Sequence, residues 1–344
     1  MQQEALTSER VDIDPADAIE FYYDKGWTDG LPVVPASEER VRLFLDQVGM
    51  RPSDVVGVVE TRGRVITAEK IAINAVMAGC RPEYMPVVVA VVRAMLEPVF
   101  NWHGSLASTG GSAQFIVVNG PVADQLHINA GVNVFGPGFR ANATIGRAIR
   151  LIIMNVTGGI PGVLDKSTFG HGGKYSFCIA ENMAASPWEP LHVQRGLQPQ
   201  DSAVTVFAAK APFQFQDHSS STPEGLIASM ADSMRPCGPN LGEFAVVWSP
   251  EHAMRFRQAG WTKRQAMEAL YREATGTVAQ LRRKGLGSSE GLEGADQGEL
   301  KPVVTSPDGI AMVVAGGDAG GFSCVIPPWG GGHLSKSVTK RIEV

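Results

Sequence analysis

Residues 115–121 read Phe115-Ile-Val-Val-Asn-Gly-Pro121, and residues 244–250 read Phe244-Ala-Val-Val-Trp-Ser-Pro250. Each stretch is a short apolar run without polar alternation, which is typical of a strand that is covered on both faces of a sheet. Each run is followed by a proline, a residue that favours the first turn of a helix. The 344-residue chain is therefore predicted to hold two units that begin as strand and then helix.

The two units stay in register beyond the proline, at an offset of 129 residues, as far as Ala-Gly pairs at 130–131 and 259–260. A second helical stretch follows in each unit, at 144–158 and at 262–276, where the offset is 118 residues. The first unit thus carries 11 more residues, within Val132-Asn-Val-Phe-Gly-Pro-Gly-Phe-Arg-Ala-Asn-Ala143. A glycine-rich insertion in one copy is typical of a functional loop. A chance likeness between two ordinary strand-helix units is the alternative.

These patterns predict an α/β fold in which two pseudo-repeated strand-helix-helix halves pack as a layered sheet with covering helices. We expect N-terminal helices and short strands over residues 1–66. The first α/β half, with its inserted glycine-rich loop, is expected over residues 67–200. The second half, which ends in a glycine-rich C-terminal segment, is expected over residues 201–344.

Composition excludes several classes of protein. The net charge of −5 disfavours a nucleic-acid partner, because phosphate binding needs a basic surface. The N-terminus lacks the apolar core of a signal peptide, and the most apolar window, 85–100, is broken by Arg93, Glu97 and Pro98. We therefore expect a cytoplasmic protein without a membrane partner. The four cysteines form no Cys-x-x-Cys pair, which predicts reduced thiols.

The inserted loop leads to the first candidate binding site. Glycines allow backbone N–H groups to approach a ligand, and the N-terminus of the helix that follows would favour negative charge. We expect Asn142 or Thr144 to cap that helix, and Arg140 and Arg147 to contact the carboxylate or phosphate of a small anion. A plain capped helix with surface arginines is the alternative.

A second candidate lies in Gly170-His171-Gly-Gly-Lys-Tyr-Ser-Phe-Cys178-Ile-Ala-Glu181-Asn182. A strand is expected to end just before Glu181, and sites in α/β folds form at strand ends. Glu181 is the candidate general acid or base, and Asn182 a candidate substrate ligand. Cys178 would act as a nucleophile only if a cation lowered its pKa. The alternative is a core cysteine beside a capping Glu-Asn pair.

Histidines supply further candidates. His103 and His192 are predicted to assist catalysis, although a structural hydrogen bond is the ordinary role of either residue. No pair of histidines has a helical metal-ligand spacing, so no metal ligand is assigned. A metal site assembled from His103, Glu181, His192 and His218 is the alternative. The sequence carries no nicotinamide, flavin or pyridoxal motif, and the cofactor is left unknown. Cys80 is expected to be a buried structural thiol.

Several longer motifs occur together along nearly the whole chain. They are Gly26-Trp-Thr-Asp-Gly-Leu-Pro-Val-Val-Pro35, Asn74-Ala-Val-Met-Ala-Gly-Cys80-Arg-Pro-Glu-Tyr84, Arg140-Ala-Asn-Ala-Thr-Ile-Gly-Arg147, Lys174-Tyr-Ser-Phe-Cys178, Ala185-Ser-Pro-Trp-Glu-Pro-Leu-His192 and Val313-Val-Ala-Gly-Gly317. In these motifs the chain resembles a large-subunit-like bacterial family associated with small proteins that carry a selenocysteine-or-Cys-Gly-Ser-Cys (UGSC) motif. It departs from that family at Ser108-Thr-Gly-Gly-Ser112, where relatives often carry a Thr-Thr-His-Pro-like stretch.

The resemblance implies redox or carbon–sulfur (carbon–heteroatom) chemistry, in the company of a small thiol or selenol protein. We therefore expect an enzyme, a lyase or an oxidoreductase, that acts on a small carboxylate- or thiol-bearing metabolite. The first alternative is a non-catalytic subunit that binds and positions the small redox partner, and the second is a metalloenzyme. A homodimer is expected from the frequency of that state among soluble proteins.

Overall fold

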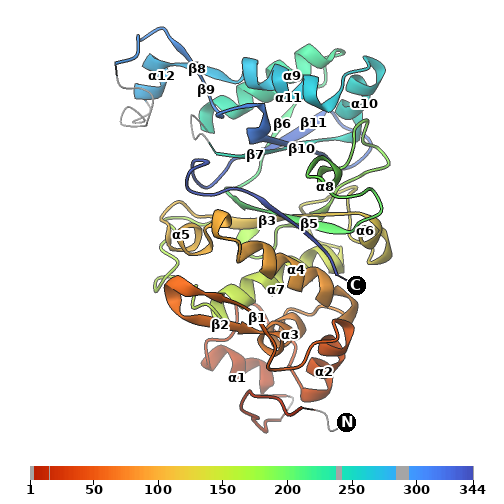
Figure 1. The fold of residues 1–344 in the computed structure, drawn as a ribbon, viewed down its shortest axis with the longest axis vertical. Helices are drawn as coiled ribbons and strands as arrows, with labels where there is room; N and C mark the ends of the chain where they lie inside the picture. Colours follow the sequence, from red (N-terminus) through yellow and green to blue (C-terminus); the bar gives the residue numbers. More distant parts are fainter. Residues whose placement is uncertain (1–3, 15, 238–241, 284–293, 344) are drawn as a thin grey trace.

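A computed structural model describes residues 4–14, 16–237, 242–283 and 294–343. It confirms the α/β class (Figure 1). The N-terminal part contains α1 (Ala18–Asp24), α2 (Glu38–Gln47), β1 (Val55–Val59), β2 (Arg64–Thr67), α3 (Ala68–Met77), α4 (Met85–Met95) and α5 (Trp102–Ala107). Next come β3 (Ala113–Asn119), α6 (Pro121–Gln125), α7 (Arg140–Asn155), β4 (Cys178–Ala180), α8 (Leu191–Gln194) and β5 (Ala203–Ala209).

The second part contains β6 (Phe213–Gln216), α9 (Pro223–Met234), β7 (Phe244–Trp248), α10 (Pro250–Gln258), α11 (Lys263–Glu273), β8 (Thr275–Thr277), α12 (Val278–Arg283), β9 (Leu300–Pro302), β10 (Ile310–Val314), β11 (Phe322–Ile326) and β12 (Val338–Arg341). Single 3-10 turns are η1 (Glu60–Arg62), η2 (Pro82–Tyr84), η3 (Pro98–Phe100), η4 (Gly172–Lys174), η5 (Arg235–Cys237) and η6 (Pro307–Gly309).

Two four-stranded sheets form the centre of the molecule, in the orders β12-β5-β3-β4 and β10-β7-β11-β6. Helices α4 and α7 cover the outer face of the first sheet, and α9, α10 and α11 cover that of the second (Figure 1). Helices α1 to α3 and the β1-β2 hairpin form a further layer beyond α4 and α7. The inner faces of the two sheets share one apolar cluster, so the sheets pack directly on each other.

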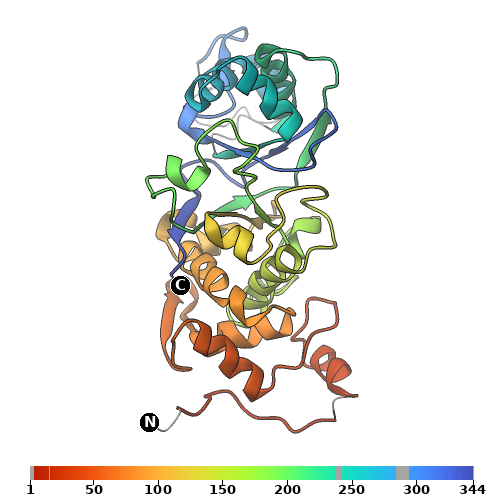
Figure 2. The same ribbon diagram turned by 90° about the vertical axis from the view of Figure 1, so that its right-hand side faces the viewer.

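Each sheet repeats one pairing pattern. Strand β3 is parallel to β4 and antiparallel to β5, and β7 is parallel to β10 and antiparallel to β11. The chain passes between the two sheets twice. Strand β6 follows β5 but pairs with β11, and β12 follows β11 but returns to pair with β5 (Figure 2). The origin of the two halves by duplication stays a prediction.

The expected boundary at residue 200 does not follow the sheets. Strand β5 begins after that boundary, yet it lies between β3 and β12 in the first sheet. The C-terminal strand β12 belongs to the first sheet as well. Hydrogen bonding between distant strands decides this assignment, and no local pattern in the sequence reports it.

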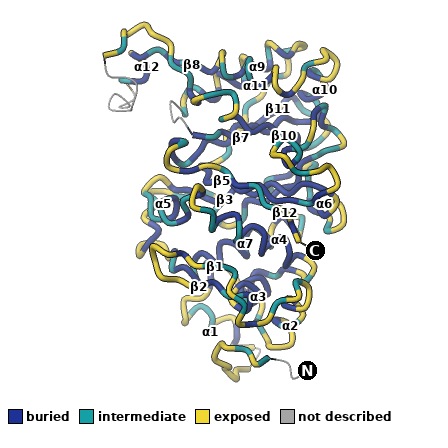
Figure 3. The backbone as a smooth tube through the Cα atoms, in the orientation of Figure 1, coloured by how far each residue is buried: buried dark blue, intermediate teal, exposed yellow. Residues whose placement is uncertain are grey.

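The predicted strands are buried on both faces, as their apolar runs indicated (Figure 3). Phe115 and Val117 of β3 join the cluster between the sheets, whereas Ile116 and Val118 pack in the cluster that contains α4 and α7. Phe177 and Ile179 likewise face the second sheet, while Cys178 faces the helices. Alternate side chains of one strand thus serve two different cores.

The predicted start of α7 is wrong. The helix begins at Arg140, its N-cap residue Phe139 makes no side-chain cap, and Asn142 and Thr144 lie inside the helix. The side chain of Asn142 is used instead to bind backbone outside the helix, and the Thr144 hydroxyl donates to the Arg140 carbonyl. In the second half Thr262 does cap α11, in a capping box with Gln265.

Within the described ranges, no single helix combines the length and the apolar composition needed to cross a bilayer. The bent pair Pro82–Met95 and Pro98–Ala107 passes that test when the two helices are taken together, by length and composition only.

We predict that Gly146→Ala destabilises the protein, although alanine normally stabilises a helix by about 1 kcal/mol relative to glycine. A Cβ atom at Gly146 would lie 2.3 Å from Ser176 Oγ and 2.7 Å from the Phe177 backbone nitrogen. The backbone cannot move away cheaply, so we expect a loss of roughly 1–3 kcal/mol in the free energy of unfolding, measured by urea denaturation. Gly172→Ala, where nothing lies within 4 Å, is the control. Equal stabilities of the two variants would contradict the prediction.

Candidate functional site

A pocket of about 390 Å³ opens where β7 and β10 end. Gln214, Val247 and Cys324 line it and lie side by side on three neighbouring strands, because Cys324 pairs with both of the others. Val247 and Cys324 belong to the cluster between the sheets, so these side chains point toward the first half of the molecule. The pocket therefore lies between the two halves, at the strand ends where α/β proteins place their ligands.

Both glycine-rich segments that the sequence singled out line this pocket. Residues 133–136 come from the inserted loop of the first half, and Ala315, Gly316, Gly317, Ala319 and Gly320 follow β10. The two segments touch, because the Gly316 N–H donates to the Ala130 carbonyl at 2.8 Å and a Cβ at Gly317 would lie 3.0 Å from the Val132 side chain. Glycine at 317 thus permits the close approach of the two loops.

Asparagine side chains hold the inserted loop in place. The Asn142 carboxamide accepts from the Asn129 N–H and donates to the carbonyls of Asn129 and Cys178. Asn133 adopts a left-handed φ of 57°, and its amide donates to the Pro137 carbonyl. Asn142, a predicted substrate ligand, is therefore 4% exposed and has its polar atoms engaged with backbone.

The wall of the pocket beside α10 contains a hydroxyl-imidazole pair that no local pattern in the sequence indicated. Ser323 Oγ lies 2.7 Å from His252 Nδ1, and His252 Nε2 lies 3.0 Å from the Asp217 carbonyl oxygen. A carbonyl only accepts, so Nε2 carries the proton and Ser323 donates to Nδ1. Ser323 pairs with Trp248, which faces α9 to α11, and its hydroxyl therefore points away from the space between the sheets. This pair therefore joins α10 to β11 at the wall of the pocket. The Ser323 hydroxyl also accepts a hydrogen bond from the Ser249 N–H.

The two arginines that were predicted to bind an anion have other partners. Arg140 donates to the carbonyls of Gly79 and Cys80, just beyond the C-terminus of α3. Arg147 makes two hydrogen bonds to the Asp29 carboxylate and two more to the carbonyls of Leu31 and Pro32. Neither arginine lines the pocket, and Thr144 and Asn182 do not line it either.

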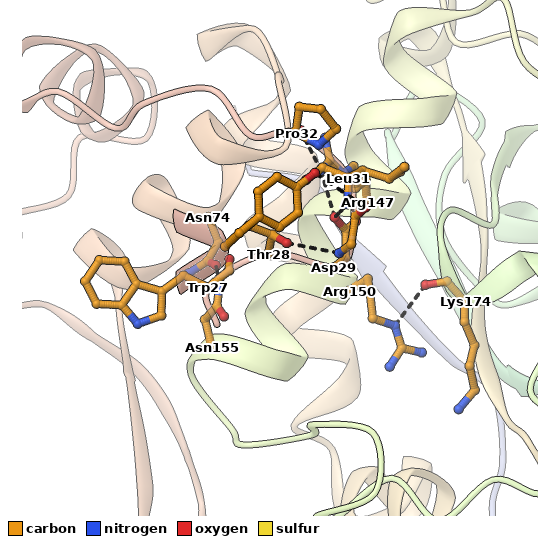
Figure 4. Close-up of polar contacts among 12 residues, drawn as sticks. Trp27, Thr28, Asp29, Leu31, Pro32, Asn74, Arg147, Arg150, Asn155 and Lys174 are labelled. Carbon is orange, nitrogen blue, oxygen red and sulfur yellow. Dashed lines mark hydrogen bonds and ion pairs between the residues drawn. The ribbon is translucent and has the colours of Figure 1, made fainter. Parts of the chain in front are cut away.

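The Arg147 contacts fasten the N-terminal connector to α7 (Figure 4). The Asp29 side chain is 3% exposed, and Asn155, two turns further along α7, donates to the Trp27 carbonyl and to Asn74. The connector that the sequence marked as turn-rich, residues 26–35, is thus a strap held by one buried ion pair and several carbonyl contacts.

Glu181 lies behind the pocket, in the first residue after β4, and is 3% exposed. Its Oε2 accepts from Asn119 Nδ2 at 2.6 Å and from the Leu191 N–H at 2.8 Å. Within the described residues its Oε1 has no hydrogen-bond partner. Burial raises the pKa of Glu181, and the nearby Lys263 ammonium opposes that shift. A carboxyl group with these properties holds its proton to a higher pH than an exposed carboxyl group does.

Lys263 and His192 accompany Glu181. Burial lowers the pKa of Lys263, whose ammonium donates to the Glu189 carbonyl, and Glu181 opposes the shift. Burial also lowers the pKa of His192, which is fully buried, against the effect of the Pro199 and Gln198 carbonyls. One backbone contact joins this group to the pocket: the Asn182 N–H donates to the Val314 carbonyl at 2.7 Å, directly before the lining residue Ala315.

The cysteines are packed thiols. Burial raises the pKa of Cys178, and the other charge acting on it, that of Cys80, raises it further. Burial raises the pKa of Cys80 to about 12, consistent with the predicted structural role, and its thiol donates to the Thr144 carbonyl. Cys324 lines the pocket, and burial raises its pKa to about 12. Arg140 and Arg147 act to lower the pKa of Cys80, but burial outweighs them, so none of the three is a thiolate at neutral pH.

The four residues of the alternative metal site, His103, Glu181, His192 and His218, do not form a cluster. Among the described residues, no three His, Cys, Asp or Glu side chains are arranged to hold a metal ion. His103 lies on α5, while His218 stacks edge-on against Phe322 in the second half.

Comparison of the sequence with models of known protein families gives no match. Comparison with curated proteins gives no significant match either.

We predict that Asp29→Ala lowers the free energy of unfolding by about 3–5 kcal/mol, because it leaves the largely buried Arg147 guanidinium without its carboxylate. Urea denaturation monitored by tryptophan fluorescence measures the change. Asp12→Ala removes the carboxylate of the exposed Arg10–Asp12 pair and is expected to have little effect. A loss of similar size in both variants would show that the strap is not held by this ion pair.

We predict a pH-dependent difference in stability between the wild type and Glu181→Gln. The folded-state pKa of Glu181 is raised, so the stability linked to its proton is present below the ordinary value of 4.5 and is lost as pH rises through the folded pKa. Glutamine keeps the shape without the charge. The free energy of unfolding of the wild type should therefore fall relative to that of Glu181→Gln as pH increases above 4.5. Parallel pH profiles would contradict the raised pKa.

Proposed function

We propose that this protein is an enzyme that binds a small anionic molecule, bearing a carboxylate or a thiol, in the pocket between the two glycine-rich loops. The observation that carries the proposal is the convergence of the inserted loop and the segment after β10 on one cavity. A loop present in only one half, placed against a second glycine-rich loop at strand ends, is the arrangement expected of a ligand site.

The lining supports an anion in two ways. Its polar lining residues, Asn133, Gln214, Ser249 and Ser323, are neutral, and no acidic residue is among the described residues that line the pocket. Ser249 is the N-cap of α10, where the helix dipole favours an anion. Backbone groups would then take the role that the sequence assigned to Arg140. The Glu251 carboxylate near this end is already engaged by the Gly320 N–H, which holds the glycine-rich loop.

Glu181 is proposed as the general acid or base. Its pKa is raised, and its Oε1 has no hydrogen-bond partner among the residues that the structure describes, as suits a group that moves a proton; Lys263 lies close enough to influence its charge. His192 is the proposed assistant. The resemblance to the UGSC-associated family suggests carbon–heteroatom lyase chemistry, in which a base removes a proton and an acid protonates the departing heteroatom.

The proposal is tested by a thermal-shift screen with small carboxylates and thiols, followed by turnover assays on the hits. Ala319→Trp introduces a large ring at an exposed position of the lining and should abolish the shifts, whereas Ala16→Trp, on the exposed N-terminal segment, should keep them. Glu181→Gln should retain binding and lose about 10²–10⁴-fold in kcat. Hits that survive Ala319→Trp would place the ligand elsewhere, and an unchanged kcat would remove Glu181 from the mechanism.

A second candidate function is the binding of a small thiol or selenol protein without chemistry in this chain. Two exposed apolar side chains lie at the pocket: Val132 is 68% exposed and Phe322 is 44% exposed. Exposed apolar groups near a pocket of this kind are typical of a protein contact. Phe322→Ser should then prevent co-purification with a co-expressed partner, whereas Phe169→Ser, at the far end of the first sheet, should not. Turnover by the isolated chain would argue against this role.

A further inference from the structure

A buried cluster with excess positive charge lies between α7 and the beginning of β3, at the end of the first sheet opposite the pocket. Lys174 donates to the Asp165 carboxylate, and Arg150 Nη1 lies 3.7 Å from the same carboxylate. The side chains of Arg150, Lys174 and Asp165 are 7%, 16% and 4% exposed. Two cations therefore share one anion in a site with little water.

The extra charge is not balanced by the next carboxylate. Asp29 also acts on Arg150, but it already forms the ion pair with Arg147. Burial lowers the pKa of Arg150 and of Lys174, because a cation is less stable in a site with little water than in solution. A buried net charge is expensive unless an opposite charge accompanies it.

The same region contains buried polar atoms without partners in the part of the chain that the structure describes. They are Arg150 Nη2, Gln114 Nε2 and Ser112 Oγ. These three residues are 6%, 6% and 2% exposed. The first two atoms can only donate hydrogen bonds, and the hydroxyl can donate one. Buried polar groups are almost always satisfied, so an acceptor is missing here.

The backbone brings these donors to one place. Arg150 Nε donates to the Lys174 carbonyl at 2.9 Å, and η4, which ends at Lys174, lies beside β3. The preceding loop runs along residues 109–112, because the Thr168 N–H donates to the Thr109 carbonyl at 3.0 Å. Ser112 and Gln114 share the face of β3 that packs in the same cluster as α7.

Figure 4 shows the direction of the two cations. The guanidinium of Arg150 and the amino group of Lys174 point the same way, away from the Arg147–Asp29 pair. The ion pair and the cluster are therefore separate features of α7, and the cluster is not part of the strap.

We propose that Arg150, Lys174, Gln114 and Ser112 bind a small oxyanion, such as phosphate, sulfate or a carboxylate group. A guanidinium offers a fork of N–H groups that matches such an anion, and an amide and a hydroxyl add directed hydrogen bonds. One negative charge on the ligand would neutralise the cluster. This site is distinct from the pocket proposed above and does not depend on the function assigned to it.

The experiment measures Tm as sodium phosphate or sodium sulfate replaces sodium chloride at constant ionic strength. A bound anion raises Tm in a saturable manner. We expect a rise of a few degrees for the wild type, with an apparent Kd weakened at least about tenfold in Gln114→Leu and the effect abolished in Arg150→Gln. Two controls should match the wild type: Lys166→Gln, which removes an exposed lysine from the same loop, and Ala319→Trp, which changes only the other pocket.

A rise in Tm that never saturates, or one of the same size in Gln114→Leu as in the wild type, would overturn the proposed oxyanion site. Gln114→Leu keeps all charges and decides the matter if Arg150→Gln does not fold. A second measurement is independent of stability: crystals soaked in selenate should show anomalous density within hydrogen-bond distance of Arg150 Nη2. Selenate seen only in the pocket, or not at all, refutes the site.

Discussion

The packing of the two central sheets against each other is the constraint on which the rest of the structure depends. Apolar side chains from both sheets, among them Phe115, Phe207, Val247 and Ile326, form one layer between them. The chain passes from the first sheet to the second between β5 and β6 and returns between β11 and β12, so the two sheets are covalently linked at two crossings. Burial of both faces explains why the central strands are continuous apolar runs instead of alternating ones.

This packing brings together chain ends that would otherwise be unrelated. Backbone contacts from Asn182 to Val314 and from Gly316 to Ala130 join the carboxyl ends of β4 and β10 at one edge. The inserted loop and the second glycine-rich loop meet there, and the Glu181 carboxyl lies just behind them. A buried carboxyl group with a raised pKa behind a cavity lined by neutral residues is consistent with the proposed chemistry, because burial shifts the proton affinity and backbone dipoles can stabilise a negative charge.

Helix α7 connects these features. Its first turn holds the inserted loop through Asn142, its middle binds the N-terminal strap through Arg147, and Arg150 enters the cationic cluster at the far end of the sheet. Gly146 allows the helix to approach the segment before β4 closely enough for these contacts. A single rigid element thus fixes the spacing between the pocket and the proposed oxyanion site.

The sequence by itself determined what depends on near neighbours: the α/β class, the buried strands at Phe115 and Phe244, and the strand end before Glu181. It also predicted the inserted glycine-rich loop and noted the glycine-rich C-terminal segment. Only the tertiary structure decided which partners the polar groups take, since those lie far apart in the chain. Arg140 and Arg147 read as surface cations ready for an anion, but folding gave them the carbonyls beyond α3 and the Asp29 carboxylate. The His252–Ser323 and Arg150–Asp165 pairs follow from strand pairing and helix packing, which no local pattern encodes.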